Sequence, residues 1–145
     1  MRIDPPPDGE PVETEQIAFL TVEQVVLLHE ESIRRYSSGE SAALRDPGLL
    51  ESAVMNPRQT FGGDYLYDSL AAMSAAYLIG LCQNHAFENG NKRVAFAACA
   101  TFLRLNGWQL TLTQDEAVDL TLRVAERRID RDEIVAVLEG KALLL

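Results

Sequence analysis

One short segment of the sequence gathers residue types that could perform chemistry together. Residues 85–93 read His-Ala-Phe-Glu-Asn-Gly-Asn-Lys-Arg and lie between two apolar stretches. His85 is the one side chain of this segment that exchanges a proton near neutral pH, which makes it a candidate general base. Phe87 alternates with the polar residues and is expected to hold the segment against the core.

The second half of the same segment predicts a binding site for an anion. Gly90 permits a tight turn, and Asn91 is expected to cap a helix that begins at Lys92. A helix start presents unpaired backbone N–H groups and the positive end of the helix dipole, both of which attract phosphate. Lys92 and Arg93 add positive charge there, and an arginine can bind a phosphate through two hydrogen bonds. A well-capped turn with two solvated charges is the structural alternative.

The elements that must position this segment are predicted to be helices. Three helices open with a capping box, in which Thr or Asp is followed three residues later by Glu or Gln. Another opens with an Asp cap followed directly by proline. The predicted helices cover residues 21–36, 47–55, 68–84, 92–106, 113–127 and 130–139.

The fold class predicted from this pattern is all-α, a compact bundle of about six helices around a central buried helix. Residues 92–106 are apolar nearly all round and are expected to be that central helix, closed by Gly107. Residues 56–67 are the least regular part, with a proline and two glycines among aromatic residues. They form either a loop or a small hairpin.

Length and composition indicate one globular domain. The chain has 145 residues, of which 47% are hydrophobic and 24% charged. Residues 1–17 are rich in proline and acidic side chains and are predicted to be a disordered tail, which leaves a domain over residues 18–145. The formal net charge of −9 argues against binding to the phosphate backbone of a nucleic acid.

Cysteine usage and hydropathy point to a cytoplasmic protein. Cys82 and Cys99 lie in apolar stretches and are expected to be buried thiols rather than a disulfide framework. The N-terminus lacks the pattern of a secretory signal, and the longest mainly apolar run, residues 70–82, is too short to span a bilayer. His29 lies on the apolar stripe of the first predicted helix and is expected to be a buried structural histidine.

Residues 85–93 resemble the signature loop of the Fic/Doc superfamily. That pattern is His-x-Phe-x-acid-Gly-Asn, followed by Gly-Arg in Fic proteins and by Lys-Arg in Doc-type (death-on-curing) toxins. The stretches LTVEQVVLLHE, RDPGLLESAV, QTFGG and FLRLNGW also resemble Doc-family sequence in the same order. The resemblance covers residues 20–140 and implies the helical Fido fold and a type II toxin-antitoxin system.

The resemblance also implies roles for individual residues. His85 would be the general base that removes a proton from a target hydroxyl. Asn89 stands where the family has an acidic magnesium ligand, and the neighbouring Glu88 could substitute for it. Target docking would fall to a flap ahead of the motif helix, at Thr60, Phe61 and Gly62. The nucleotide phosphates would be held by loop amides together with Gly90, Asn91, Lys92 and Arg93.

The implied activity is the transfer of the terminal phosphate of ATP, with Mg²⁺, to a Ser/Thr hydroxyl of a cytosolic protein, a translation elongation factor. The Lys-Arg pair favours this chemistry over the AMP transfer typical of Fic enzymes, which remains an alternative. A catalytically silent relative that only binds a nucleotide or a partner is a third possibility, because of Asn89. The sequence lacks the inhibitory helix pattern of many Fic proteins, so an antitoxin acting in trans is expected, with no direct nucleic-acid or membrane partner.

Overall fold

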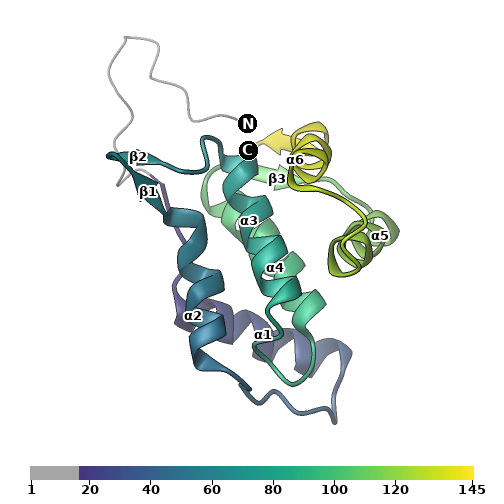
Figure 1. The fold of residues 1–145 in the computed structure, drawn as a ribbon. Helices are drawn as coiled ribbons and strands as arrows, with labels where there is room; N and C mark the ends of the chain where they lie inside the picture. The colour runs from purple at the N-terminus through teal and green to yellow at the C-terminus, as the bar shows by residue number, and fades with distance from the viewer. Residues whose placement is uncertain (1–16) are drawn as a thin grey trace.

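The structure, a computed structural model, describes residues 17–145. The predicted disordered tail lies outside the described residues except for Ile17, whose side chain is buried in the core. The described chain folds into six α-helices and two small antiparallel sheets, which confirms a mostly helical fold (Figure 1). The elements are α1 (Val22–Tyr36), α2 (Pro47–Met55), the 3-10 turn η2 (Asn56–Arg58), β1 (Thr60–Phe61), β2 (Asp64–Tyr65), α3 (Leu70–Gln83), α4 (Asn91–Leu105), β3 (Trp108–Leu110), α5 (Gln114–Ala125), α6 (Arg131–Gly140) and β4 (Ala142–Leu144).

Five of the six described α-helices begin with a side chain that closes their first turn. Each capping oxygen accepts a hydrogen bond from the backbone N–H three residues further along. In α1, α5 and α6 the partner side chain returns the bond, which confirms the predicted capping boxes. The third helix starts at Leu70, two residues later than predicted, because its cap is Ser69. The capping residues are Thr21, Asp46, Ser69, Thr113 and Asp130.

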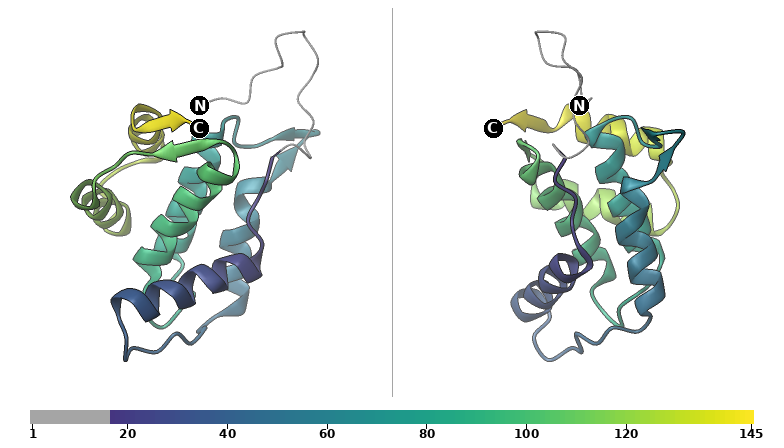
Figure 2. Two further views of the ribbon diagram at one scale, coloured as in Figure 1. Left: turned by 180° about the vertical axis from the view of Figure 1, so that it is seen from behind. Right: turned by 90° about the vertical axis from the view of Figure 1, so that its left-hand side faces the viewer.

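α3 is the most deeply buried helix, and α2, α4, α5 and α6 all pack against it (Figures 1 and 2). The sequence pattern assigns the central position to residues 92–106, which are α4. In the structure α4 lies beside α3 and keeps one side toward solvent, where Lys92, Arg93 and Arg104 are exposed. Between residues 17 and 145, no helix combines the length and the apolar character needed to cross a bilayer.

Both cysteines are buried free thiols at the contact of α3 with its neighbours, as predicted. Burial raises the pKa of Cys82 to about 11 and that of Cys99 to about 12. Cys99 is fully enclosed between α4 and α3, and its neighbour Ser74 forms a hydrogen bond with it. At neutral pH both side chains therefore remain protonated and act as small apolar groups.

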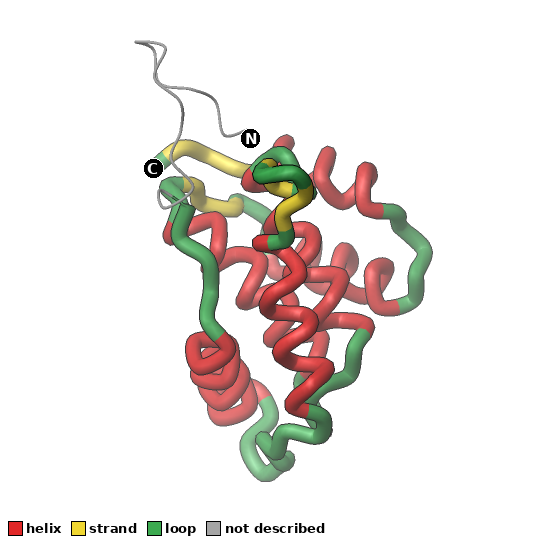
Figure 3. The backbone as a smooth tube through the Cα atoms, turned by 60° about the vertical axis from the view of Figure 1, so that its left-hand side comes forward, coloured by secondary structure: helices red, strands yellow, loops and turns green. Residues whose placement is uncertain are grey.

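Two hairpin-like pairings lie at one end of the helices (Figure 3). β1 pairs with β2 across Gly62 and Gly63, which both have positive φ angles of the kind that two-residue hairpin turns require. Residues 56–67 therefore contain the small hairpin. The second sheet, β3 with β4, was not predicted: Trp108 pairs with Leu144 although α5 and α6 separate them in sequence. Strands of three residues leave too short a periodicity to recognise.

Candidate active site

His85 lies where the chain leaves α3 and turns toward α4. It follows the C-cap Asn84 and has a φ of +52°, the left-handed conformation that glycine usually adopts at this position. A residue with a Cβ atom adopts it at a cost of about 1–2 kcal/mol. The side chain is exposed and has no hydrogen-bond partner within the described residues. The chain thus tolerates backbone strain and presents a free imidazole to solvent.

The start of α4 is the one described α-helix start without a capping side chain. Its N-cap is Gly90, in the left-handed conformation with a φ of +75°. The N–H of Val94 donates to the carbonyl of Gly90 and is the first of this helix to bond within the backbone. The N–H groups of Asn91, Lys92 and Arg93 have no acceptor within residues 17–145. Free N–H groups and the positive end of the helix dipole are features that can bind an anion.

Asn91 does not cap α4 as predicted. The helix begins at Asn91 itself, and the side chain reaches back to the loop instead. Its Nδ2 donates to the Phe87 carbonyl at 2.9 Å, and its Oδ1 accepts from the Phe87 N–H at 3.1 Å. Phe87 is buried, which confirms its predicted role as the anchor of the loop. Asn91 therefore shapes the loop through its side chain and offers an anion its backbone N–H.

The two cations of the loop are held differently. The Arg93 guanidinium lies 5.1 Å from the centre of the Tyr36 ring and donates to the Ser37 hydroxyl at the end of α1. Lys92 is exposed and forms no ion pair in the described part of the chain. Arg93 is therefore a positioned charge at the α4 start, whereas Lys92 is exposed and forms no ion pair among the described residues.

The segment between α1 and α2 lies along the loop, which the sequence did not reveal. The carbonyl of Ala86 accepts from the N–H groups of Arg45 at 2.7 Å and Asp46 at 3.0 Å. The N–H of Glu88 donates to the carbonyl of Ala43 at 3.1 Å. These bonds form a short antiparallel pairing that fixes the His85 end of the loop against the start of α2. No local sequence signal marks a pairing between residues so far apart.

His29 supports the loop from the opposite side. It is fully buried on α1, as predicted, and its Nε2 lies 2.6 Å from the carbonyl oxygen of Asn89. Its ring stacks on Phe87 with centroids 3.6 Å apart and an interplanar angle of 13°. Burial lowers the pKa of His29, which keeps the ring neutral.

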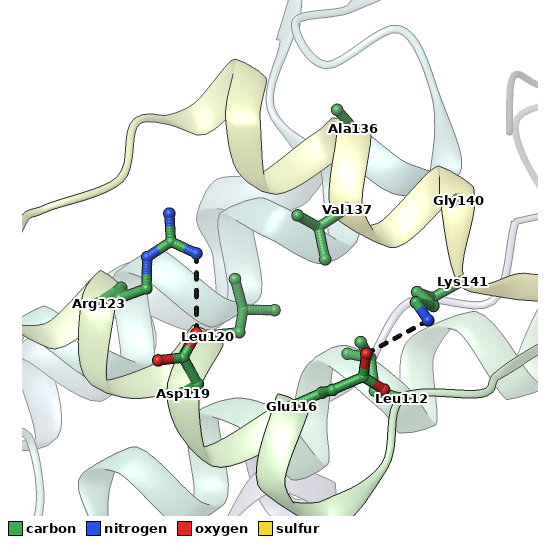
Figure 4. A pocket seen from close by; sticks show the side chains of 9 residues that line it. All are labelled: Leu112, Glu116, Asp119, Leu120, Arg123, Ala136, Val137, Gly140 and Lys141. Carbon is green, nitrogen blue, oxygen red and sulfur yellow. Dashed lines mark ion pairs between the residues drawn. The ribbon is translucent and has the colours of Figure 1, made fainter.

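A pocket of 340 Å³ between α5 and α6 is the alternative place for a ligand (Figure 4). Its charged side chains neutralise one another: Asp119 pairs with Arg123 at 3.8 Å, and Glu116 pairs with Lys141 at 3.3 Å. Leu120 also lines the pocket and makes the lining partly apolar. Because these charges are already paired and neither histidine of the chain lines the pocket, loop 85–93 is the better candidate for catalysis.

The sequence of this chain is similar to those of known proteins. A protein-family model described as the Fic/DOC family matches residues 19–103. The chain belongs to the Fic/DOC family. It is 45% identical over 106 residues to "Toxin Doc" of Mycolicibacterium smegmatis, a match that covers 72% of this chain and 82% of that protein. It is 30% identical over 119 residues to "Protein kinase doc" of Escherichia phage P1, covering 82% and 91%. Within the Fic/DOC family the chain is therefore of the Doc type.

Asn89, which stands where the Fic/DOC signature has an acid, forms a hydrogen bond within this chain. The Nδ2 of Asn89 donates to the carbonyl of Ser41 at 3.2 Å, which leaves its Oδ1 without a partner within the described residues. Glu88 is exposed beside it. No three His, Cys, Asp or Glu side chains between residues 17 and 145 lie close enough to form a metal site. A cation bound here would take no more than one or two ligands from these side chains, with the rest from water or a bound molecule.

The hairpin predicted as a docking flap is far from this Fic/DOC loop. Thr60, Phe61 and Gly62 precede α3, whereas loop 85–93 follows it, so they lie at opposite ends of this helix (Figures 1 and 3). At a rise of roughly 1.5 Å per residue, the 14 residues of α3 separate them by about 20 Å. Phe61 is 83% exposed and available for contacts, but the residues beside His85 are those of the segment 43–46.

Proposed function

We propose that this chain is a Doc-type toxin that transfers the terminal phosphate of ATP to a Ser/Thr hydroxyl of a cytosolic protein. One observation carries the proposal. A free imidazole at His85 lies on the same loop as the uncapped start of α4, with Lys92 and Arg93 beside it. Phosphoryl transfer to a hydroxyl requires a proton acceptor, N–H groups that donate hydrogen bonds to the phosphate, and positive charge. The similarity to the phage protein named a protein kinase favours phosphate over AMP as the transferred group.

In the proposed reaction His85 accepts the proton of the target hydroxyl as its oxygen bonds to the γ-phosphorus. The bond from that phosphorus to its bridging oxygen breaks, and ADP leaves. The amides of Gly90, Asn91 and Lys92 bind the phosphate oxygens, and Arg93, held on Tyr36, stabilises the negative charge. Gly90 contributes its backbone alone.

Mg²⁺ fits the loop only as a companion of the nucleotide. Asn89 offers one neutral oxygen, Oδ1, and Glu88 is the neighbouring carboxylate. Magnesium sites commonly combine one or two protein oxygens with substrate phosphates, and these residues suit that arrangement. When bound, the cation would supply positive charge to the phosphates of the nucleotide.

The proposed partners are a protein substrate and an antitoxin. A translation elongation factor is the substrate that the Doc resemblance implies, and the missing inhibitory pattern requires restraint in trans. A target that contacts the hairpin at Phe61 as well as His85 must span the length of α3. The acidic chain gives no reason to add a nucleic acid.

A silent relative that binds a nucleotide without turnover is the second candidate, favoured by Asn89. Its amide is tied to Ser41, and an amide is a weaker ligand of a hard cation than a carboxylate. Under this alternative the chain binds ATP equally well with and without Mg²⁺ and transfers nothing.

The test compares γ-labelled with α-labelled ATP, using the full chain, bacterial lysate and Mg²⁺, alongside His85→Ala. Label on a protein band from γ-ATP alone, absent with His85→Ala, is the expected result. Label from α-ATP would identify AMP transfer instead. Label from neither nucleotide, with tight metal-independent ATP binding, would favour the silent relative.

A further inference from the structure

His29 is a buried histidine whose side-chain hydrogen bond and ring stacking both go to the signature loop, to Asn89 and Phe87. A carbonyl oxygen only accepts hydrogen bonds, so the 2.6 Å contact requires that the Nε2 of His29 carry the proton and donate it to Asn89. The Nδ1 of the same ring then bears a lone pair, and it is buried with no hydrogen-bond partner in the described residues. An apolar ring at this position would avoid that orphaned nitrogen. The bond from Nε2 is therefore the polar contact that distinguishes this histidine from an apolar ring.

The same ring closes off the space beneath Gly90. A Cβ atom on Gly90 would lie 3.3 Å from the Nε2 of His29 and 3.0 Å from the Cδ1 of Ile33. The backbone of the loop thus rests directly on α1, at a place where a side chain has no room. Contact with Ile33 and the bond to His29 hold the peptide between Asn89 and Gly90 from below.

Pinning that carbonyl also fixes the N–H of the same peptide. In a planar trans peptide the C=O and the N–H point in opposite directions. Because the Asn89 oxygen is directed into α1, the Gly90 N–H is directed away from it. That N–H has no acceptor among residues 17–145, and it precedes the free N–H groups at the start of α4.

We propose that His29 is a positioning residue of the nucleotide site: its bond to Asn89 orients the Gly90 N–H toward the phosphate. This inference rests on the proposed function, because it assigns the anion at the α4 start to a nucleotide. His29 takes no part in proton transfer, since its ring is buried beneath the loop.

The first test uses the unmodified full chain without nucleotide. Long-range ¹H–¹⁵N correlation of the histidine rings reports which nitrogen carries the proton. His29 is expected in the Nε2–H form. A proton on Nδ1 would remove the bond to Asn89 and overturn the proposal, whatever the chain is later found to catalyse.

The second test compares variants. His29→Phe keeps the stacking on Phe87 and removes the donor, His29→Gln keeps a donor, and Val25→Ala is a matched loss of packing on α1. His29→Phe is expected to weaken ATP binding about tenfold, the loss typical of one hydrogen bond to a charged group. His29→Gln should recover part of the affinity. Val25→Ala should lower the melting temperature and leave the ATP affinity unchanged.

The Gly90 amide signal separates failure of this inference from failure of the proposed function. In nucleotide-free protein this signal should move in His29→Phe and stay in place in Val25→Ala. If the unmodified chain does not bind ATP, the nucleotide assignment fails, and the amide signal still reports whether His29 orients the peptide. An unchanged Gly90 signal, or unchanged ATP affinity in a folded His29→Phe protein, would overturn the proposal. If that variant does not fold, the ring-nitrogen spectrum and His29→Gln decide.

Discussion

The starts of α4 and α5 meet the same physical requirement in opposite ways. Each helix start leaves backbone N–H groups without an internal partner. At α5 the chain supplies its own acceptors: Thr113 Oγ1 accepts from the Glu116 N–H at 3.1 Å, and Glu116 Oε1 accepts from the Thr113 N–H at 2.9 Å. At α4 the N-cap is Gly90, which has no side chain to offer.

The charges next to the two helix starts differ in the same sense. α5 places Asp115 and Glu116 in its first turn, which complements the positive end of the dipole. The bond from the Thr113 N–H, reinforced by Lys141, lowers the pKa of Glu116. α4 places Lys92 and Arg93 there, adding positive charge to positive potential. The N–H groups at the α5 start therefore have partners within the chain, whereas those at the α4 start are left available for the anion that we propose.

The largest expected effect comes from removing the free imidazole. His85→Ala should reduce the initial rate of phosphate transfer at least about 100-fold, the usual contribution of a general base. His85→Gly should be equally inactive but more stable than His85→Ala by about 1 kcal/mol, because glycine adopts the left-handed conformation without strain. Transfer assays and thermal unfolding check the two halves of this prediction. Residual transfer above a few per cent in both variants would exclude His85 as the base.

A smaller effect is expected from the two positively charged side chains at the uncapped start of α4. Lys92→Ala or Arg93→Ala should each weaken ATP binding about tenfold and reduce its dependence on salt, because each removes a charged contact to phosphate. Calorimetric titration at two salt concentrations measures both effects. The control is Arg128→Ala, since Arg128 pairs with Glu126 beyond α5. Equal losses in Arg128→Ala would mean that net charge, and not the α4 start, sets the affinity.

Changes at the capped start of α5 should affect the stability of the fold and not ATP binding. Thr113→Ala removes the cap of α5 and should lower the free energy of unfolding by about 1 kcal/mol, with ATP affinity unchanged. Denaturant unfolding and the same titration provide the measurement. A loss of ATP affinity would contradict the separation of the two helix starts.

The capped start of α5 should also contribute to the pH dependence of stability. Glu116 has a lowered pKa in the folded chain, so its contribution is present above its unfolded value of 4.5 and is lost as pH falls through the folded value. In Glu116→Gln the free energy of unfolding should therefore fall less steeply as the pH is lowered below 4.5. If the free energies of unfolding of the unmodified chain and of Glu116→Gln change in parallel down to low pH, the hydrogen bonds of the Glu116 carboxylate do not stabilise the fold.

The smallest expected effect concerns the cysteines. With pKa values of about 11 for Cys82 and about 12 for Cys99, and with both thiols buried, native protein at pH 8 should react with a thiol reagent only on unfolding. Fast labelling of Cys99 would show that the contact between α3 and α4 opens in the native protein.

Local features of this fold could be predicted from the sequence, and distant contacts could not. Caps such as Thr21 and Asp130 act within three residues, so the helix starts were predicted to within a residue or two. Hydrophobicity alone shows that a helix is buried but does not identify its neighbours, and residues 92–106 were therefore placed at the centre instead of α3. The pairing of β3 with β4 depends on chain closure, for which no local pattern exists.

The same distinction applies to the site. The loop residues from His85 to Arg93 were predicted as a group because they are contiguous. The residues that hold the loop in place were not predicted. The carbonyls of Ala43 and Ser41 accept hydrogen bonds from the loop, although α2 and α3 separate them from it in the sequence. The role of Asn91 changed for a geometric reason, since α4 starts one residue earlier than predicted and turns its amide toward Phe87. The hairpin was allowed for, but its position at the far end of α3 depends on topology.

The bond between His29 and Asn89 has a consequence for how this molecule acquires its activity during folding. The two residues are 60 positions apart, and the contact between Asn89 and Ser41 spans 48. Contacts over such separations form late, because the chain between them loses entropy before they are made. A partly folded chain in which α3 and α4 have paired, but α1 has not docked, lacks the oriented Gly90 amide. We therefore expect nucleotide binding to appear after helix formation during refolding, so that incompletely folded molecules would not yet bind the nucleotide.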